Sequence, residues 1–210
     1  MTKIVLADDH EVVRAGFKLI LEQTGQFTVV GEAADGNQAY AIAAREKPDV
    51  LMMDISMPPG KSGLAACEKI NHDLPNIRII ITTMYAEAEY LYHALRSGAR
   101  GYLLKSASPD EMIKAVQAVA DGGTYVSPKM MEMLSQGLPE DLKATQQLSS
   151  RELEICRLLA KGYTNREVAE QLFISIKTVE AHRSKIYSKL GLKSRADLVS
   201  FALRHKMLDF

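Results

Sequence analysis

The first half of the chain alternates short apolar runs with longer amphipathic stretches. The runs are rich in Val, Ile, Leu and Met, as expected of strands buried on both faces, and the stretches between them keep helical spacing. Crossovers of this length connect parallel neighbouring strands, so the pattern predicts a doubly wound α/β domain with a five-stranded parallel sheet. The runs are KIVLA, FTVVGEA, DVLMMD, IRIIIT and GYLLK, and helices are expected over residues 10–23, 36–46, 61–73, 86–98 and 108–121.

The last third of the chain carries helix start and stop signals instead. Ser149 and Thr164 each open a capping box completed by a glutamate three residues later, and Gly162 and Gly191 follow helical stretches as stop residues. The short turn FIS between the second and third helices predicts a helix-turn-helix arrangement within an all-α domain of four helices. The four helices are expected over residues 150–161, 165–172, 176–190 and 195–206.

The segment between these halves is opened by Gly122 and Gly123 and interrupted by Pro128 and Pro139. Such breakers predict a linker over residues 123–144 with one short helix across KMMEMLSQ. The methionines of that helix could contact the other domain, or the helix could pack on its own domain. The expected domains are therefore residues 1–122 and residues 145–210.

The net charge of zero conceals a division along the chain. Residues 1–122 hold 12 Lys and Arg against 16 Asp and Glu, a balance of −4, whereas residues 147–210 hold 12 against 7, a balance of +5. The acidic half could hold Mg²⁺, and the basic half could meet nucleic acid. The N-terminus carries no export signal pattern, and Cys67 and Cys156 lack CxxC spacing. We therefore expect a cytoplasmic protein with buried thiols and no membrane partner.

Five polar residues stand where apolar runs of the first half end: Asp8, Asp9, Asp54, Thr83 and Lys105. The carboxyl ends of parallel strands share one edge of a sheet, so these side chains should converge. Three neighbouring carboxylates repel one another until a cation enters, which predicts a metal and an anion. A single Asp at a strand end is usually a turn or cap residue, but five polar residues at one edge favour a pocket.

The roles within that pocket follow from the chemistry of the side chains. Asp54 follows the central strand and can act as a carboxylate nucleophile toward phosphorus, which gives an acyl phosphate. The charge of that group needs Mg²⁺, a hard cation that prefers oxygen ligands, and a second cation such as Lys105. Thr83 can donate to a phosphoryl oxygen, with Tyr102 as its partner. His10 we interpret as a surface or capping residue rather than as a ligand.

The motifs LADDHEVVRAG, LMMDISMPPGKSG, IITTMYAE and GYLLKSAS resemble the receiver domain of two-component response regulators, a flavodoxin-like fold, over residues 1–122. Two departures are visible: the loop MPPGKSG is one residue longer than usual, and Ser106 stands where many receivers have proline. The resemblance implies that Asp54 is the phosphoacceptor, that Asp8, Asp9 and Asp54 with the Ser56 carbonyl hold Mg²⁺, that Thr83 and Tyr102 form the switch pair, and that Lys105 binds the phosphoryl group.

The third predicted helix of the last third has two distinct faces. Val179, His182, Ile186 and Leu190 share one face, so this is the core face and His182 is expected to be a packed histidine. The opposite face carries small, hydrogen-bonding and basic side chains that suit a DNA major groove. The candidate DNA-binding residues are Lys177, Thr178, Glu180, Ala181, Arg183, Ser184, Lys185 and Lys189, of which Arg183, Lys185 and Lys189 suit phosphates and Glu180 a cytosine amino group.

Residues 145–208 resemble the LuxR-type helix-turn-helix domain, and the family's base-reading positions fall at Glu180, Ala181 and Ser184. Joined to a receiver, this domain resembles the NarL/FixJ group of transcriptional regulators. MPPGKSG and TVEAHRSKI look closest to its NreC-like nitrogen and oxygen regulators. The resemblance implies a non-enzymatic regulator that accepts a phosphoryl group from a sensor histidine kinase and binds double-stranded promoter DNA as a homodimer.

Two other classes of function compete with this interpretation. A phosphohydrolase would use the same carboxylates, but Ser56 stands two positions after Asp54, where a second Asp could act as the acid. A small-molecule sensor would bind its ligand in the first half of the chain. The acidic pocket and the absence of Trp argue against this class.

Overall fold

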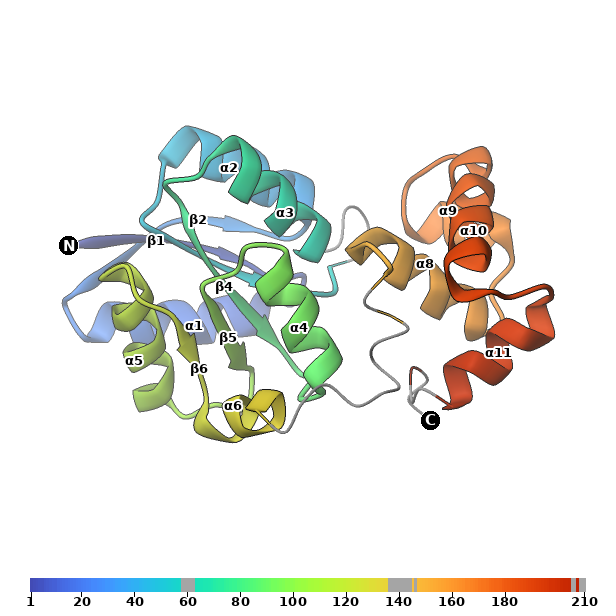
Figure 1. The fold of residues 1–210 in the computed structure, drawn as a ribbon. Helices are drawn as coiled ribbons and strands as arrows, with labels where there is room; N and C mark the ends of the chain where they lie inside the picture. The colour runs from blue at the N-terminus through green and yellow to red at the C-terminus, as the bar shows by residue number, and fades with distance from the viewer. Residues whose placement is uncertain (58–62, 136–144, 146, 205–206, 208–210) are drawn as a thin grey trace. The chain divides into compact units, whose positions relative to one another are not determined.

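The computed structural model describes residues 1–57, 63–135, 145, 147–204 and 207. It divides the chain into two compact units, Met1–Ser135 and Gln136–Phe210, which are described separately below (Figure 1).

Unit 1 is an α/β domain around one parallel sheet. Its strands lie in the order β2-β1-β3-β4-β5-β6, so the chain winds outward from β1 in both directions. The strands are β1 (Thr2–Ala7), β2 (Phe27–Ala33), β3 (Val50–Asp54), β4 (Arg78–Thr83), β5 (Gly101–Leu104) and β6 (Tyr125–Val126). The helices are α1 (Glu11–Gln23), α2 (Gly36–Glu46), α3 (Gly63–Asp73), α4 (Ala88–Arg96), α5 (Pro109–Ala120) and α6 (Pro128–Ser135).

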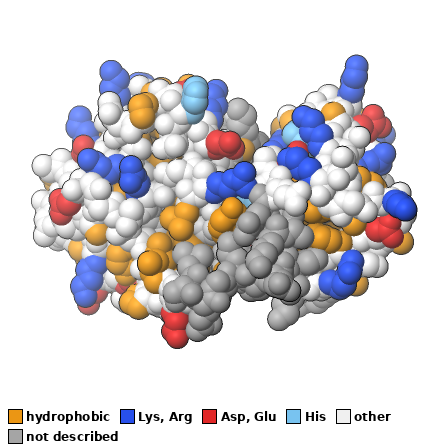
Figure 2. Space-filling view, in the orientation of Figure 1, with side chains coloured by type: hydrophobic (Ala, Val, Ile, Leu, Met, Phe, Trp, Pro, Cys, Tyr) orange, Lys and Arg blue, Asp and Glu red, His pale blue; other side chains and the backbone are white. Residues whose placement is uncertain are grey.

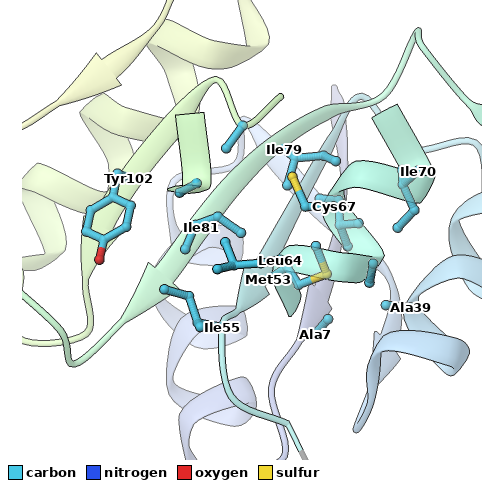
Figure 3. Packing of buried hydrophobic residues seen from close by; sticks show 14 of the residues in the cluster. Ala7, Ala39, Met53, Ile55, Leu64, Cys67, Ile70, Ile79, Ile81 and Tyr102 are labelled. Atoms are coloured by element: carbon cyan, nitrogen blue, oxygen red, sulfur yellow. The ribbon is translucent and has the colours of Figure 1, made fainter. Parts of the chain in front are cut away.

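Both faces of the sheet are buried, as the continuous apolar runs predict. Alternate residues of each strand point to opposite faces, so Val5 and Leu51 join one core cluster while Ile4 and Val50 join the other. Helices α1 and α5 cover the second face, and α2, α3 and α4 cover the first (Figure 1). Figure 3 shows Met53 and Ile79 of the sheet packed against Cys67 of α3.

The sheet has a sixth strand, so the prediction of five strands is wrong. After α5 the chain turns at Gly122, whose φ of +92° favours glycine, and the Tyr125 amide donates to the Arg100 carbonyl at 2.9 Å. Strand β6 then pairs with β5 in parallel. A strand of two residues is too short to leave a recognisable apolar pattern.

Helix α6 confirms the short helix expected across KMMEMLSQ. It contacts α4, and Met130 is buried in the same cluster as the sheet residues of unit 1. The first part of the predicted linker therefore packs on unit 1. Residues 136–144 of the predicted linker lie outside the described residues.

The helices described in unit 2 match the four expected ones within two residues at each end. They are α8 (Ser150–Ala160), α9 (Asn165–Gln171), α10 (Ile176–Leu190) and α11 (Arg195–Arg204). Both predicted capping boxes are formed, at Ser149 and Thr164, and Gly191 ends α10 with φ +66°. The turn between α9 and α10 includes Phe173, whose φ is +51°. None of the helices that the structure describes could span a membrane.

Candidate functional site

Four strand ends of unit 1 bring the predicted pocket together. Strand β1 pairs with β3, β3 with β4 and β4 with β5, so the carboxyl ends of these strands are neighbours. Asp8 follows β1, Asp54 ends β3, Thr83 ends β4 and Lys105 follows β5. The Lys105 amide donates to the Thr83 carbonyl at 2.8 Å, which fixes where the lysine side chain leaves the sheet.

The centre of the pocket is an ion-paired triad. Lys105 Nζ lies 2.8 Å from Asp54 Oδ2 and 2.7 Å from Asp8 Oδ2. The side chains are 10% exposed for Lys105, 6% for Asp54 and 3% for Asp8, so the charges are largely withdrawn from water. Separating any one of these charges from its partners would therefore be costly.

This environment shifts the pKa of two members of the triad. Burial raises the pKa of Asp54 above its ordinary value, and the neighbouring Lys105 only partly opposes that rise. Burial alone would lower the pKa of Lys105, but its hydrogen bonds to Asp54 and Asp8 outweigh burial, and its pKa is raised. Lys105 thus remains a cation beside a carboxylate that binds a proton more readily than an exposed aspartate.

A second group of side chains adjoins the triad on the side of α1. Oxygen or nitrogen atoms of Asp8, Asp9, His10 and Asp54 all lie within 4.8 Å of one another. The three carboxylates are hard oxygen donors of the kind that Mg²⁺ prefers, so the residues present fit that ion. Ser56, whose carbonyl the family resemblance assigns to the metal, follows β3 as an exposed residue.

His10 takes the N-cap position of α1, but its side chain caps nothing. Its amide donates to Asp8 Oδ1 at 2.9 Å, and its ring Nδ1 lies 2.8 Å from Asp9 Oδ1. The side chain is 67% exposed, which confirms the surface position expected from sequence and excludes a side-chain capping role.

Sequence reasoning missed Arg14, one turn further along α1. Its Nη1 donates to the Asp8 carbonyl at 2.7 Å and so holds the turn that carries the two aspartates. The presence of this Arg in the motif LADDHEVVRAG was the sequence signal that could have identified it.

The predicted switch pair is joined through a residue that sequence reasoning also missed. Tyr85 donates its amide to Thr83 Oγ1 at 3.2 Å and accepts from the Tyr102 hydroxyl on its carbonyl at 2.8 Å. Thr83 and Tyr102 are both fully buried, and Tyr102 belongs to the core cluster of Figure 3. The Tyr85 ring stacks on Tyr90 of α4 with centroids 4.1 Å apart. The backbone of Tyr85 is thus the physical link between the two predicted switch residues.

The backbone behind Asp54 leaves no space for a side chain at Gly63. The Gly63 amide donates to the Ile55 carbonyl at 2.8 Å, and a Cβ on Gly63 would lie 1.7 Å from the Asp54 carbonyl oxygen. The start of α3 can therefore lie against the end of β3 only with glycine there. Gly63 is the last residue of the lengthened loop MPPGKSG, and residues 58–62 of that loop lie outside the described residues.

Helix α10 of unit 2 presents the two faces expected of it. Val179 and Ile186 are buried, and His182 is half-buried with burial lowering its pKa. Of the candidate DNA-binding residues, Thr178 is half-buried, and the exposed ones are Lys177, Glu180, Ala181, Arg183, Ser184, Lys185 and Lys189. Several Lys and Arg side chains stand on the face of this unit seen in Figure 2.

Two of the candidate basic residues already have partners within unit 2. Lys189 pairs with Glu152, the buried carboxylate that completes the first capping box. Arg183 Nη1 donates to Asn165 Oδ1 at 3.4 Å, near the start of α9. These contacts tie α10 to the starts of α8 and α9 and so orient the exposed face of α10.

Comparison with known families divides the chain in the same way. The response regulator receiver domain model matches residues 4–117, and the model described as bacterial regulatory proteins, luxR family, matches residues 146–202.

Similar proteins span the whole chain. Oxygen regulatory protein NreC of Staphylococcus carnosus (strain TM300) is 51% identical over 216 residues, covering 99% of this chain and 100% of that protein. The NreC protein of Staphylococcus haemolyticus (strain JCSC1435) is 50% identical with the same coverage. Among solved structures, the chain is similar to RcsB from Salmonella enterica serovar Typhimurium bound to promoter P1flhDC in the presence of the phosphomimetic BeF3−. The TM-score is 0.71 and the sequence identity 30%, and the match covers 95% of this chain and 97% of the RcsB chain.

Proposed function

The chain belongs to the response regulators of the NarL/FixJ type, two-component transcriptional regulators with a receiver domain and a LuxR-type DNA-binding domain, and we propose the following roles for its residues. Unit 1 is the input, where a phosphoryl group from a sensor histidine kinase arrives on Asp54. Unit 2 is the output, where α10 enters the major groove of promoter DNA.

The observation that carries the input role is the Asp54 carboxylate at the end of the central strand. It is held by Lys105 and faces Asp8 and the adjoining Asp9. In the transfer, an Asp54 oxygen attacks phosphorus while the bond to the donor breaks, and Lys105 neutralises charge on the transferred group. Asp8, Asp9, Asp54 and the Ser56 carbonyl would hold Mg²⁺, which supplies further charge neutralisation there.

The switch follows from the contacts around Tyr85. A phosphoryl oxygen on Asp54 is a charged acceptor for the Thr83 hydroxyl proton, a proton that the contact with Tyr85 leaves free because Thr83 Oγ1 accepts from the Tyr85 amide; the new hydrogen bond would draw Thr83 toward Asp54. Movement of Thr83 withdraws a contact from Tyr85, whose carbonyl holds the Tyr102 hydroxyl. Rotation of Tyr102 then changes the face formed by α4 and β5. That change releases the DNA-binding domain or promotes a homodimer, and either outcome raises DNA occupancy.

The DNA contacts divide into positioning and reading residues. Lys177, Arg183, Lys185 and Lys189 would contact phosphates, and Lys189 can do so while paired with Glu152 because an ammonium has three donors. Thr178, Glu180, Ala181 and Ser184, near the start of α10, would face base edges. A homodimer would place two such helices on paired half-sites, consistent with the helix-turn-helix geometry.

Phosphorylation tests the input role directly. Acetyl phosphate with Mg²⁺ should raise the affinity of the wild-type protein for its DNA site, while Asp54→Ala should show no gain. Asp110→Asn, a change at an exposed aspartate in the first turn of α5, serves as the matched control and should respond like wild type. An equal gain by Asp54→Ala would contradict the assignment of Asp54.

Selection of DNA sites from a random pool tests the output role. The phosphorylated protein should select paired half-sites, and Ser184→Ala should change the selected bases. Arg183→Gln should instead weaken binding to all sequences and lower the slope of log affinity against log salt by about one. A sedimentation experiment that found a monomer on DNA at saturation would contradict the dimer. Turnover on free phosphate esters would favour a phosphohydrolase instead.

A further inference from the structure

A hollow at the amino edge of the sheet has no part in the proposed function. It has a volume of about 290 Å³ and lies where β4 and β5 begin, at the opposite end of these strands from Thr83 and Lys105. At a rise of about 3.3 Å per residue, the first and last residues of β4 are about 16 Å apart. The polar and glycine residues that line the hollow are Asn71, Asn76, Arg78, Gly98, Arg100 and Gly122.

Two arginines of this lining come from neighbouring strands. Arg78 begins β4 and is half-buried, and Arg100 immediately precedes β5 and is exposed. The sheet fixes both backbones, because the Arg78 amide donates to the Asp49 carbonyl at 3.2 Å and the Arg100 amide donates to the Ile79 carbonyl at 2.7 Å. Neither guanidinium forms a hydrogen bond or an ion pair with a residue that the structure describes. Both are therefore free to bind an anion in the hollow.

The lining carries no negative charge to balance these two cations, since none of its described residues is acidic. Three aspartates adjoin lining residues in the chain or the sheet, but their carboxylates accept hydrogen bonds elsewhere: Asp49 from the Lys3 amide, Asp73 from the Tyr40 hydroxyl and Asp121 from the Gln117 side chain. Two cations at one hollow repel each other, and a hollow lined by one sign of charge concentrates ions of the opposite sign. An anion would therefore be stabilised there.

Glycine at two turns keeps the hollow open. A Cβ on Gly98 would lie 2.3 Å from Asn71 Nδ2, and a Cβ on Gly122 would lie 3.9 Å from Arg78 Nη2. The amides of the two glycines donate to the last turns of α4 and α5, at Leu95 and Val119. The donors left for a ligand are thus the side chains of the two arginines and the two asparagines.

The donors and the size of the hollow indicate the chemical class of the ligand. A guanidinium offers a planar pair of N–H groups that matches two oxygens of a carboxylate or a phosphate. One carboxylate can fill one such fork, whereas a phosphate has oxygens on several sides and can accept from both arginines at once. The described lining holds no aromatic side chain on which a base could stack, and its volume is near the lower end of small-molecule sites, about 300 Å³.

We propose that Arg78 and Arg100, with Asn71 and Asn76, bind a small phosphorylated metabolite at the amino edge of unit 1. The inference goes beyond the proposed function and does not depend on it. The site shares no residue with the pocket around Asp54 or with the exposed face of α10.

The experiment follows backbone amide signals of the full-length protein by NMR during titration with inorganic phosphate. A chelator is present, the phosphodonor is left out, and chloride keeps the ionic strength constant. The amide signals of Asn76, Gly98, Arg100 and Gly122 should shift and saturate, while those of Asp54 and Lys105 stay in place. Acetate, the carboxylate probe, should bind more weakly than phosphate.

Substitutions test the two forks. Arg78→Gln and Arg100→Gln should each weaken phosphate binding by about tenfold or more, because each removes charge-assisted hydrogen bonds. Arg100→Lys keeps the charge without the fork, so its affinity should fall between those of wild type and Arg100→Gln. Arg45→Gln is the matched control, because it removes the same charge from an exposed arginine of α2 and should bind phosphate like wild type. Unshifted amide signals away from the hollow would show that each variant is folded.

The outcomes separate this site from the proposed function. Equal phosphate affinity in wild type, Arg78→Gln and Arg100→Gln, or shifts confined to unit 2, would overturn the site. An equal response to acetate would overturn the assignment of a phosphorylated ligand. Asp54→Ala should bind phosphate like wild type. A wild-type protein that binds phosphate in the hollow but gains no DNA affinity from acetyl phosphate would overturn the proposed function alone.

Discussion

The ammonium of Lys105 balances two buried carboxylates, so its removal is the sharpest test of the pocket. Lys105→Met keeps the length and apolar stem of the side chain but leaves Asp8 and Asp54 without the cation 2.7 and 2.8 Å away. Removing one partner of a buried ion pair costs about 3–5 kcal/mol. We expect about 3 kcal/mol, the lower end of that range, because Asp54 can take up a proton.

The sign of the pH dependence follows from the raised pKa of Asp54. Burial raises this pKa, and loss of Lys105 should raise it further, so the folded state binds more protons than the unfolded state above the ordinary pKa of an aspartate. Stability of the variant should therefore increase as the pH falls from 7 toward that ordinary value. Mg²⁺ should also restore stability, by about 2.7 kcal/mol at a concentration one hundred times its dissociation constant.

Thermal unfolding followed by near-UV circular dichroism reports mainly on unit 1, because six of the eight tyrosines lie there and the chain has no tryptophan. In chelator at pH 7 we expect the midpoint of unit 1 to fall by about 10 °C for a loss of about 3 kcal/mol. Lys114→Met on the exposed side of α5 is the matched control and should change the midpoint little. Unchanged stability in Lys105→Met, or a loss that neither Mg²⁺ nor lower pH reduces, would refute the electrostatic account.

Two further predictions concern backbone space and the output domain. Gly63→Ala would place a Cβ 1.7 Å from the Asp54 carbonyl oxygen and should destabilise unit 1 by about 3 kcal/mol or more. Gly16→Ala in α1 would place a Cβ with no atom within 4 Å and should stabilise unit 1 by about 0.5–1 kcal/mol. The denaturant midpoints of the two variants should therefore shift in opposite directions. Burial alone would raise the pKa of Glu152, but the contacts with Lys189 and the Ser149 backbone outweigh burial, and the pKa is lowered. The ionised Glu152 side chain should therefore stabilise unit 2 at neutral pH, and this stabilisation should be lost as the pH falls below the ordinary pKa of a glutamate. Acid unfolding of wild type and Glu152→Gln, followed by far-UV circular dichroism, should then converge at low pH; parallel curves would contradict that linkage.

Much of the fold could be predicted because its signals are local. The apolar runs place the ends of β1, β3, β4 and β5, and the capping boxes place the starts of α8 and α9, since a cap is satisfied within three residues of its helix. The strand β6 escaped prediction because its two residues are held by pairing with β5, a partner more than twenty residues away. Pairing of that kind leaves no periodicity in the short strand itself.

The residues of the candidate site could likewise be predicted only where their position in the sequence decides their place in the fold. Parallel strands share a carboxyl edge, so convergence of Asp8, Asp54, Thr83 and Lys105 follows from their positions in the sequence alone. The involvement of Tyr85 does not follow, because it acts through its backbone amide and carbonyl, which every residue other than proline possesses.

The sequence by itself determined most of the element boundaries, most of the pocket residues and the exposed face of α10, all of which depend on spacing along one strand or helix. Only the tertiary structure decided which atoms meet: Lys105 with both Asp8 and Asp54, Lys189 with Glu152, and the His10 ring with the aspartates rather than with its own helix. The physical reason is that a hydrogen bond or ion pair requires approach to within about 3 Å, and side-chain rotamers and long-range packing set such distances.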